Sequence, residues 1–264
     1  KVPVSEGRQF KVGKVQITGD TLKVPHDALL KNLSITKQEY FSREAMIKDI
    51  DYLVQMCNDE GFAYADVLFQ TAPQEKSQTV DVSYQIKKGN EVHFNRVLIT
   101  GNTKTRDKVI RRQLSVVEGD LYSKRALKRS YNALSGLRYF EEVDFQTEKG
   151  ASENQTDVMI RVKEKQTGIF SVGAGYSAID NAVVTASISQ QNLCGRGQTL
   201  TLKASIGGST QHYDLSFIEP WLFDIPLWSK FDIWNYSRTY DTYTLDSNGA
   251  GIVLGYGRGE YVTG

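Results

Sequence analysis

An internal repeat constrains the fold of this chain of 264 residues more than any other feature. The segment KVQITGD at residues 14–20 returns as RVLITGN at residues 96–102. The identical residues stand 82 positions apart: Gly7, Val15, Ile17, Thr18 and Gly19 pair with Gly89, Val97, Ile99, Thr100 and Gly101. A fixed period over this length indicates one structural unit used twice.

Each copy of the repeat predicts the element order β-α-α-β-β. An alternating strand opens the unit, at residues 10–17 and at 92–99, and a glycine suited to a positive φ follows it (Gly19, Gly101). A short helical segment comes next, at residues 26–33 and 106–114. A longer helix starts after Ser42 or Ser123 and ends near Gly61 or Gly136. Two strands close each unit, at residues 65–71 and 80–87, then at 142–147 and 157–164. This order predicts a small three-stranded sheet with two helices on one face.

Such a small sheet leaves strand edges exposed, and an exposed edge has two interpretations. In a module that handles extended chains, a strand can add to the edge through main-chain hydrogen bonds. In a structural spacer, the edge binds nothing. The pattern of residues 8–165 leaves both interpretations open.

The last third of the chain differs from the repeat in charge and in pattern. Of the 32 Lys and Arg and the 31 Asp and Glu, 27 and 23 fall within the first 165 residues. From Gly168 onward, short segments alternate apolar residues with small or polar ones, and no apolar run reaches the ~18 residues that a helical span needs. Alternating segments of about ten residues are typical of transmembrane β-strands, which satisfy their backbone by closing into a barrel.

A soluble β-sandwich also alternates, but three features favour a membrane barrel. Charge is scarce on both faces, glycine is frequent inside the segments, and aromatic residues gather near the predicted strand ends: Trp221, Trp228, Trp234, Tyr236 and Tyr240. About six strands can be found, whereas a complete single-chain barrel has at least about eight. The sequence therefore predicts α+β repeats followed by an antiparallel transmembrane β-barrel that is only partly present.

The predicted domains are residues 1–7, the tail of a preceding unit; 8–88 and 89–165, two full units; and 166–264, the first strands of a truncated barrel. The first seven residues, KVPVSEG, match YQIKKG at the end of the first full unit. This match predicts at least one further copy upstream. The lack of a signal peptide in the given sequence therefore carries little weight. Cys57 and Cys194 fall in different predicted domains, so two free thiols are favoured over a disulfide.

The repeat resembles POTRA domains, through EG…VQITGD repeated as KG…VLITGN and through Phe62, Tyr139 and Phe140 after the longer helices. POTRA domains occur in tandem on the periplasmic side of outer-membrane assembly and secretion proteins. The turns QQNLCGRGQ and FIEPWLFDIP resemble barrel turns of the BamA-type assembly factors, and their motif residues are Asn192, Gly195, Gly197, Glu219, Pro220 and Trp221.

The resemblance implies a location in the outer membrane of a Gram-negative bacterium, with the POTRA domains in the periplasm. If the first barrel strand runs outward, both turn motifs fall on the periplasmic side and residues 239–248 form an extracellular loop. These expectations rest on the number of strands, because one missed strand would reverse them.

The resemblance also implies a function, which is the insertion of client β-barrels without ATP. In this family the first barrel strand separates from the last and offers its edge to a client strand. The predicted gate strand contains Gly168, Phe170, Ser171, Val172, Gly173, Gly175 and Tyr176. Its glycines have no side chains to pack against the neighbouring strand, which weakens the strand pairing there. The POTRA strand edges are expected to guide clients to this gate by pairing at Ala65, Val67 and Phe69 and at Glu142, Val143 and Phe145.

The expected partners are unfolded outer-membrane proteins, periplasmic chaperones, accessory outer-membrane lipoproteins and the lipid bilayer. The resemblance assigns Glu118, in VVEGD, to a lipoprotein contact on the barrel-proximal POTRA domain. The alternative for Glu118 is an ordinary acidic loop residue.

Three other functions remain open for this sequence: a two-partner secretion transporter, a translocation and assembly factor for autotransporters, and a soluble structural protein. The remnant at residues 1–7 predicts at least three POTRA copies, which favours assembly factors over the usual two-domain secretion transporter. Catalysis, cofactors and metals have little support, because His26, His93 and His212 lack ligand spacing. Nucleic-acid binding is not expected either, since the basic run at residues 106–112 has no aromatic platform.

Overall fold

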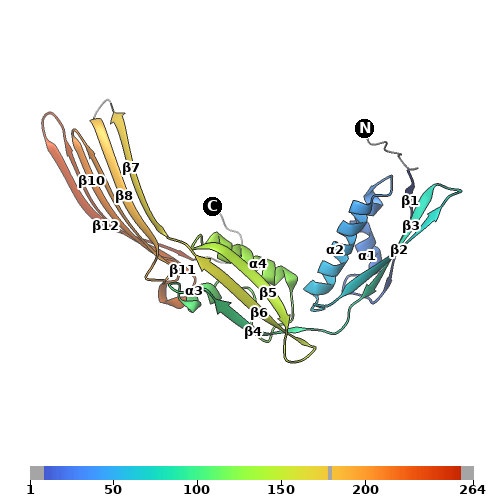
Figure 1. Cartoon of the computed structure of the whole chain (residues 1–264). Helices are drawn as coiled ribbons and strands as arrows, with labels where there is room; N and C mark the ends of the chain where they lie inside the picture. The colour runs from blue at the N-terminus through green and yellow to red at the C-terminus, as the bar shows by residue number, and fades with distance from the viewer. Residues whose placement is uncertain (1–8, 178–179, 257–264) are drawn as a thin grey trace, which may run out of the picture. The chain divides into compact units, whose positions relative to one another are not determined.

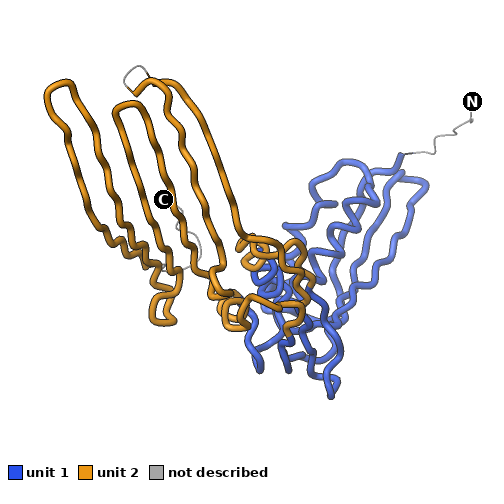
Figure 2. The backbone as a smooth tube through the Cα atoms, turned by 60° about the vertical axis from the view of Figure 1, so that its left-hand side comes forward, with its two compact units in different colours: residues 1–98, 114–132, 145–160 blue, residues 99–113, 133–144, 161–264 orange. Residues whose placement is uncertain are grey.

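The structure, a computed structural model, describes residues 9–177 and 180–256 (Figure 1). The predicted remnant at residues 1–7 lies outside the described residues. The chain divides into two compact units, which Figure 2 colours separately. The first unit holds residues 1–98, 114–132 and 145–160, and the second holds residues 99–113, 133–144 and 161–264.

The first copy of the repeat has the predicted element order. Its elements are β1 (Lys11–Gly19), α1 (His26–Asn32), the short 3-10 helix η1 (Ile35–Lys37), α2 (Arg43–Asp59), β2 (Asp66–Gln74) and β3 (Thr79–Lys87). The sheet order is β1-β3-β2, with β1 parallel and β2 antiparallel to β3. The strand β2 therefore lies at an edge of this sheet.

The longer helix of the first copy is fixed by its cap and by a buried carboxylate. Ser42 caps α2 as predicted, because its Oγ accepts the N–H of Ala45 at 3.3 Å. Asp49 is 1% exposed on α2 and accepts hydrogen bonds from the N–H groups of Ser34 and Ile35 and from the hydroxyl of Tyr84. These bonds satisfy the buried charge and join η1, α2 and β3 in one apolar core.

The second copy of the repeat has the same order of main elements. They are β4 (His93–Thr100), α3 (Asp107–Arg111), α4 (Lys124–Gly136), β5 (Phe140–Lys149) and β6 (Gln155–Glu164), and the sheet order is β4-β6-β5. Ser123 Oγ accepts the N–H of Ala126 at 3.2 Å, so the predicted cap is confirmed. Gly19 and Gly101 have φ values of 92° and 88°, as expected for the end of the opening strand. Among the described residues, no helix is long and apolar enough to cross a membrane.

The structure corrects one local expectation in the second copy. The short helix predicted over residues 106–114 is only five residues long, because the chain leaves it to run along β4. The N–H of Gly119 donates to the carbonyl of Phe94 at 2.7 Å, and the N–H of Tyr122 donates to that of Val92 at 2.8 Å. The longer helix α4 ends at Gly136, as predicted, and the positive φ after it falls on Arg138, at 59°.

The last part of the described chain forms one antiparallel sheet. Its strands are β7 (Gly168–Ser177), β8 (Asn181–Leu193), β9 (Gln198–Gly207), β10 (Thr210–Glu219), β11 (Leu227–Thr239) and β12 (Thr244–Tyr256), with the short η2 (Leu222–Asp224) after β10. The order β12-β11-β10-β9-β8-β7 follows the chain. The expected loop at residues 239–248 is wrong, because β12 starts at Thr244 and only residues 240–243 join it to β11. Polar pairs such as Asn235 with Asn248 extend this hairpin.

The register of this sheet separates an apolar face from a polar face. One row of neighbours crosses all six strands on the apolar face: Phe170, Ile188, Leu202, Leu215, Ile233 and Ala250. The adjacent row on the other face is Ser171, Ser187, Lys203, Asp214, Trp234 and Gly249. Phe170 and Ile233 are 69% and 59% exposed. A continuous exposed apolar band opposite a polar face is typical of strands that face lipid on one side.

The cysteines are both free, Cys57 buried and Cys194 exposed, as the sequence favoured.

Candidate functional site

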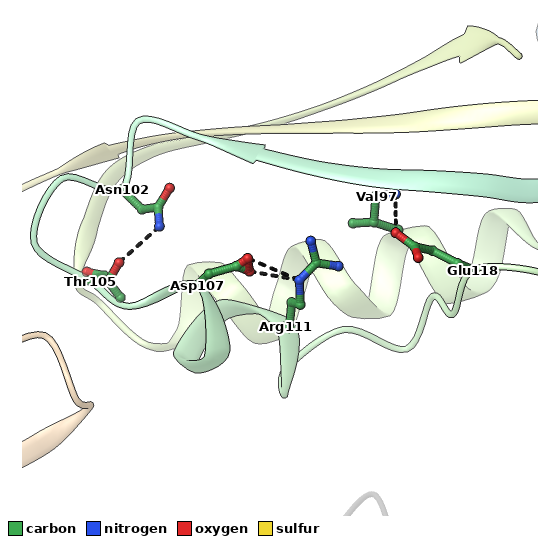
Figure 3. Close-up of polar contacts among 6 residues, drawn as sticks. All are labelled: Val97, Asn102, Thr105, Asp107, Arg111 and Glu118. Atoms are coloured by element: carbon green, nitrogen blue, oxygen red, sulfur yellow. Dashed lines mark hydrogen bonds and ion pairs between the residues drawn. The ribbon is translucent and has the colours of Figure 1, made fainter.

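A loop that follows β4 is held by one carboxylate at the end of β6. Glu164 accepts hydrogen bonds from the Thr103 hydroxyl at 2.7 Å and from the N–H groups of Lys104 and Thr105 at 2.9 and 2.6 Å. The side-chain amide of Asn102 donates to the carbonyl of Thr105 at 3.0 Å (Figure 3). Burial raises the pKa of Glu164, but the hydrogen bonds from Thr105 and its neighbours outweigh it and lower the pKa to about 2. The loop is therefore a preformed surface.

The turn between β8 and β9, which is the first of the two predicted barrel turns, docks on this preformed loop. The Asn192 amide nitrogen donates to the Thr105 hydroxyl at 2.8 Å, and the N–H of Arg106 donates to the carbonyl of Gly195 at 2.9 Å. Gly195 has a φ of 70°, and a Cβ there would collide with the carbonyl oxygen of Lys104. Glycine is thus required at position 195 both for its conformation and for its close approach to the loop.

The turn between β10 and β11 contacts the same region through α3. Lys108 Nζ lies 2.6 Å from Asp224 Oδ2, and the Arg112 guanidinium lies 5.2 Å from the ring centre of Trp221. Burial lowers the pKa of Arg112. Glu219 orders its own turn by accepting the N–H of Trp221 at 2.9 Å, and it also accepts the side-chain amide of Gln198, the first residue of β9, at 2.6 Å.

The Tyr139 hydroxyl adds a third contact, because it donates to the carbonyl of Gly197 at 3.1 Å. Both predicted turns therefore lie at the same end of the strands β7–β12, the end next to the second repeat copy. This agrees with the expectation that both turns lie on one side. A cavity of roughly 700 Å³ lies next to the first turn, lined by Thr105, Glu164, Gln190 and Asn192 among others.

The predicted gate strand corresponds to β7, which is one of the two edges among the described strands of the sheet. A Cβ at Gly173 or at Gly175 would meet no atom within 4 Å. The base of β7 is tied instead, because the Thr167 hydroxyl donates to the Gln191 carbonyl at 2.6 Å and accepts the Gln190 amide at 2.8 Å. The start of β7 is therefore anchored to the end of β8.

The predicted pairing edges correspond to β2 and β5, which are edge strands in their sheets. Phe69 is 47% exposed on β2, but Val67 is only 4% exposed, and Ala65 precedes the strand. Glu142, Val143 and Phe145 all lie in β5. Pro73 lies inside β2, and a proline is accommodated in a strand only where its nitrogen points away from the neighbour. Backbone N–H groups alternate in direction along a strand, and Val67 and Phe69 stand an even number of residues from Pro73. Their N–H groups therefore point to the free edge of β2, away from β3.

Glu118 has a contact within its own domain. Its Oε1 accepts the N–H of Val97 at 2.9 Å and so covers a donor on the outer side of β4 (Figure 3). Figure 3 also shows Arg111 bound to Asp107 on α3. A lipoprotein contact at Glu118 stays a prediction.

The comparisons with known proteins agree with this architecture. Residues 10–89 and 92–165 match the POTRA model, described as surface antigen variable number repeat, and residues 192–264 match the Omp85 superfamily domain. The two matches to the POTRA model together cover more than half of the chain, so the chain belongs to the POTRA family, with two tandem copies. The predicted fold class is thereby confirmed, whereas the domain limits at residues 88 and 165 stay predictions.

Two similar proteins are outer membrane protein assembly factors named BamA. The chain is 31% identical to BamA of Nitratidesulfovibrio vulgaris over 264 residues, 98% of this chain and 33% of that protein. It is 32% identical to BamA of Neisseria meningitidis serogroup B over 271 residues, 99% of this chain and 34% of that protein. The chain thus spans about a third of these relatives.

A solved structure supports the fold as well. The crystal structure of BamA from Haemophilus ducreyi lacking POTRA domains 1–3 matches with a TM-score of 0.80 at 22% identity, over 92% of this chain and 47% of that one.

Sequence reasoning missed Thr105, Arg112 and Tyr139, which contact the turns, and Glu164, which holds the loop of Thr105. One signal was available in a difference between the two repeat copies. After Gly19 the first copy continues with the apolar Leu22, which is 8% exposed, while the second copy has Lys104 in its place. The polar loop in the second copy indicates a surface that meets something other than its own core.

Proposed function

We propose that this chain is part of an outer-membrane β-barrel assembly and insertion factor. The proposal places its POTRA domains in the periplasm and its barrel strands in the outer membrane, where it acts on unfolded outer-membrane proteins without ATP. The observation that carries the proposal is the apolar row that crosses all six strands and ends at the edge strand β7. The naming of the similar BamA proteins as outer membrane protein assembly factors supports it.

The edge of β7 is the proposed gate. A strand edge in lipid leaves backbone donors and acceptors unsatisfied, and each such group costs several kcal/mol. A client strand that pairs with β7 removes this cost, which drives insertion without nucleotide hydrolysis. The glycines at 173 and 175 weaken side-chain packing along the gate, and the Thr167 contacts keep its base in place.

The POTRA edges β2 and β5 are proposed to hold clients before they reach the gate. Both edges offer main-chain groups to an extended segment regardless of its sequence. The segment at residues 117–122 already occupies much of the outer side of β4, which leaves β5 as the open edge of its sheet. Clients would therefore pair with β2 and β5.

The remaining partners belong to the same proposal. Periplasmic chaperones deliver the clients, and an accessory lipoprotein contacts the loop that carries Glu118. The protein acts as an assembly factor and not as an enzyme, since the proposed driving force is strand pairing and burial in lipid. Its chemistry requires no cofactor.

Client assembly by the full-length parent protein in phospholipid vesicles tests this function. An unfolded β-barrel protein is added without nucleotide, and its folding is followed by heat-modifiable gel mobility and protease protection. The proposal predicts faster folding than in empty vesicles. A secretion transporter would move a soluble polypeptide across the vesicle wall without folding the client, and an autotransporter factor would assist only autotransporter clients. Either of these results would contradict general barrel assembly.

A further inference from the structure

A basic pocket lies where α3 meets the turn between β10 and β11. It has a volume of about 470 Å³, and its lining includes four cationic side chains, Arg106, Lys108, Arg112 and Arg196. Two carboxylates, Glu219 and Asp224, also line it. The pocket therefore has an excess of positive charge.

The carboxylates leave most of this positive charge unpaired. Asp224 pairs with Lys108 at 2.6 Å, and both oxygens of Glu219 accept hydrogen bonds, one from the N–H of Trp221 and one from the side-chain amide of Gln198 on β9. Within residues 9–177 and 180–256, neither Arg106 nor Arg196 forms an ion pair, and both are exposed. Two guanidinium groups are thus free to bind an anion in a planar, two-pronged geometry.

Arg112 adds a third cationic group, which is held in a fixed position. Its guanidinium lies over the Trp221 ring, and its Nη2 donates a 3.4 Å hydrogen bond to the Arg196 carbonyl. Its Nε is buried without a hydrogen-bond partner in the part of the chain that the structure describes. At the pocket, Arg112 therefore links α3 both to the β10–β11 turn and to the turn that carries Arg196.

The strand register gives the depth of the pocket. Gln198 and Glu219, which line it, lie two residues beyond Leu200 and Phe217, which are cross-strand neighbours on the apolar face. Since side chains alternate along a strand, Gln198 and Glu219 continue that face at its POTRA end. The pocket therefore lies where the lipid-facing surface ends and the headgroup layer begins.

The same turn exposes apolar side chains beside the pocket. Phe223 is 82% exposed with a φ of 58°, and Ile225 is 47% exposed. Together with Trp221, they give the turn the mixed aromatic and apolar character of residues that enter the acyl boundary next to lipid headgroups. A soluble anion would make no use of these side chains.

We propose that this pocket binds the headgroup phosphate of an anionic glycerophospholipid at the periplasmic rim of the barrel. Arg106 and Arg196 bind the phosphate, while Phe223 and Ile225 contact the acyl chains. The bound lipid would then bridge α3 and the β10–β11 turn. This site goes beyond the assembly function, and it can be tested without any client protein.

Native mass spectrometry of the delipidated full-length parent protein tests this site. Phosphatidylglycerol and phosphatidylcholine are titrated separately, and phosphatidylglycerol is titrated again in the presence of inorganic phosphate. The test variant combines Arg106→Gln with Arg196→Gln. The control variant combines Lys128→Gln with Arg161→Gln, which removes the same charge from exposed positions outside the pocket. Heat-modifiable gel mobility verifies that both variants are folded, and Arg196→Gln alone serves if the double variant is not.

We expect phosphatidylglycerol to bind the parent protein and the control variant more tightly than phosphatidylcholine does. Each lost cation near an anionic headgroup weakens binding about fivefold, so the test variant, which lacks two, should bind phosphatidylglycerol about twenty-five-fold more weakly. Equal retention of phosphatidylglycerol by the test and control variants would overturn the site. Displacement of the lipid by inorganic phosphate would also overturn it, since the pocket would then be a site for free phosphate.

Discussion

The side-chain amide of Asn192 donates a 2.8 Å hydrogen bond to the hydroxyl of Thr105, which precedes it by 87 residues. Its Oδ1 accepts the N–H of Gly197 at 2.8 Å, so one side chain both shapes the turn and attaches it to the second POTRA domain. Thr105 is in turn fixed by Glu164. The first barrel turn is therefore connected to β6 through Thr105, whose hydroxyl binds Asn192 and whose N–H binds Glu164.

Replacement of Gly195 by alanine should disrupt this junction. The new Cβ would collide with the Lys104 carbonyl, and the positive φ adds about 1–2 kcal/mol of backbone strain for an L-residue. We expect a lower thermal midpoint of the full-length protein in detergent. Gly255→Ala is the matched control, because a Cβ there lies at an ordinary 3.5 Å from the Trp228 ring. Equal midpoints for the two variants would contradict this account of the junction.

The Glu164 carboxylate should make the junction sensitive to acid. Hydrogen bonding lowers its pKa from 4.5 to about 2, so its contribution to stability is complete above pH 4.5 and is lost as the pH falls toward 2. The parent protein should therefore exceed Glu164→Gln in unfolding free energy near neutral pH, and the difference should shrink through this window. Denaturant titrations of both proteins at several pH values measure it. If the difference in unfolding free energy between the two proteins does not change with pH, the charge of the Glu164 carboxylate does not contribute to the stability of the junction.

Asp59 should act as a second cap of α4. It ends α2, yet its Oδ1 accepts the N–H of Arg125 at 3.1 Å and its Oδ2 pairs with that guanidinium at 3.0 Å. Asp59→Ala should cost about 1 kcal/mol, which corresponds to about fivefold faster amide hydrogen exchange in the first turn of α4. Glu44→Ala, which removes an exposed pair with Lys48 on α2, is the control and should leave that turn unchanged. Unaltered exchange in Asp59→Ala would contradict the capping role.

The β2 edge gives a prediction that separates backbone from side chain. Phe69→Pro removes an N–H that points to the free edge, whereas Phe69→Ala removes only the exposed ring. Photocrosslinking of clients to β2 should fall in the proline variant and stay near the parent level in the alanine variant. An equal loss in both would assign the contact to the ring. Val67 is less suitable for this test, because a proline there would also leave a gap in the core.

Most of the fold could be predicted because its signals are local and repeated. The glycine after the opening strand, the serine caps and the period-two alternation each act over a few residues, and they appear twice or more. The prediction failed where a non-local contact prevailed. Backbone hydrogen bonds to Phe94 draw the chain out of α3, and pairing with β11 extends β12 through a polar stretch that resembled a loop.

The candidate site was harder to predict, because its two sides come from distant segments. The turn glycines could be recognised from their own sequence, but neither Tyr139, which binds the first turn, nor Glu164, which holds the loop beneath it, carries a local sign of its role. Their roles follow only from the docking geometry. In the same way, the sequence predicts no aromatic partner for the basic run at residues 106–112, whereas the Arg112 guanidinium lies over the Trp221 ring.

Site-specific photocrosslinking from Ser171 in the full-length parent protein in cells tests the central proposal most directly. A probe at Lys203 is the control, because it lies in the same cross-strand row as Ser171 but on β9, which is paired on both sides. The account predicts capture of the terminal strand of barrel precursors at Ser171 and not at Lys203. Capture at Ser171 of a secreted polypeptide alone, with no barrel precursor, would contradict it.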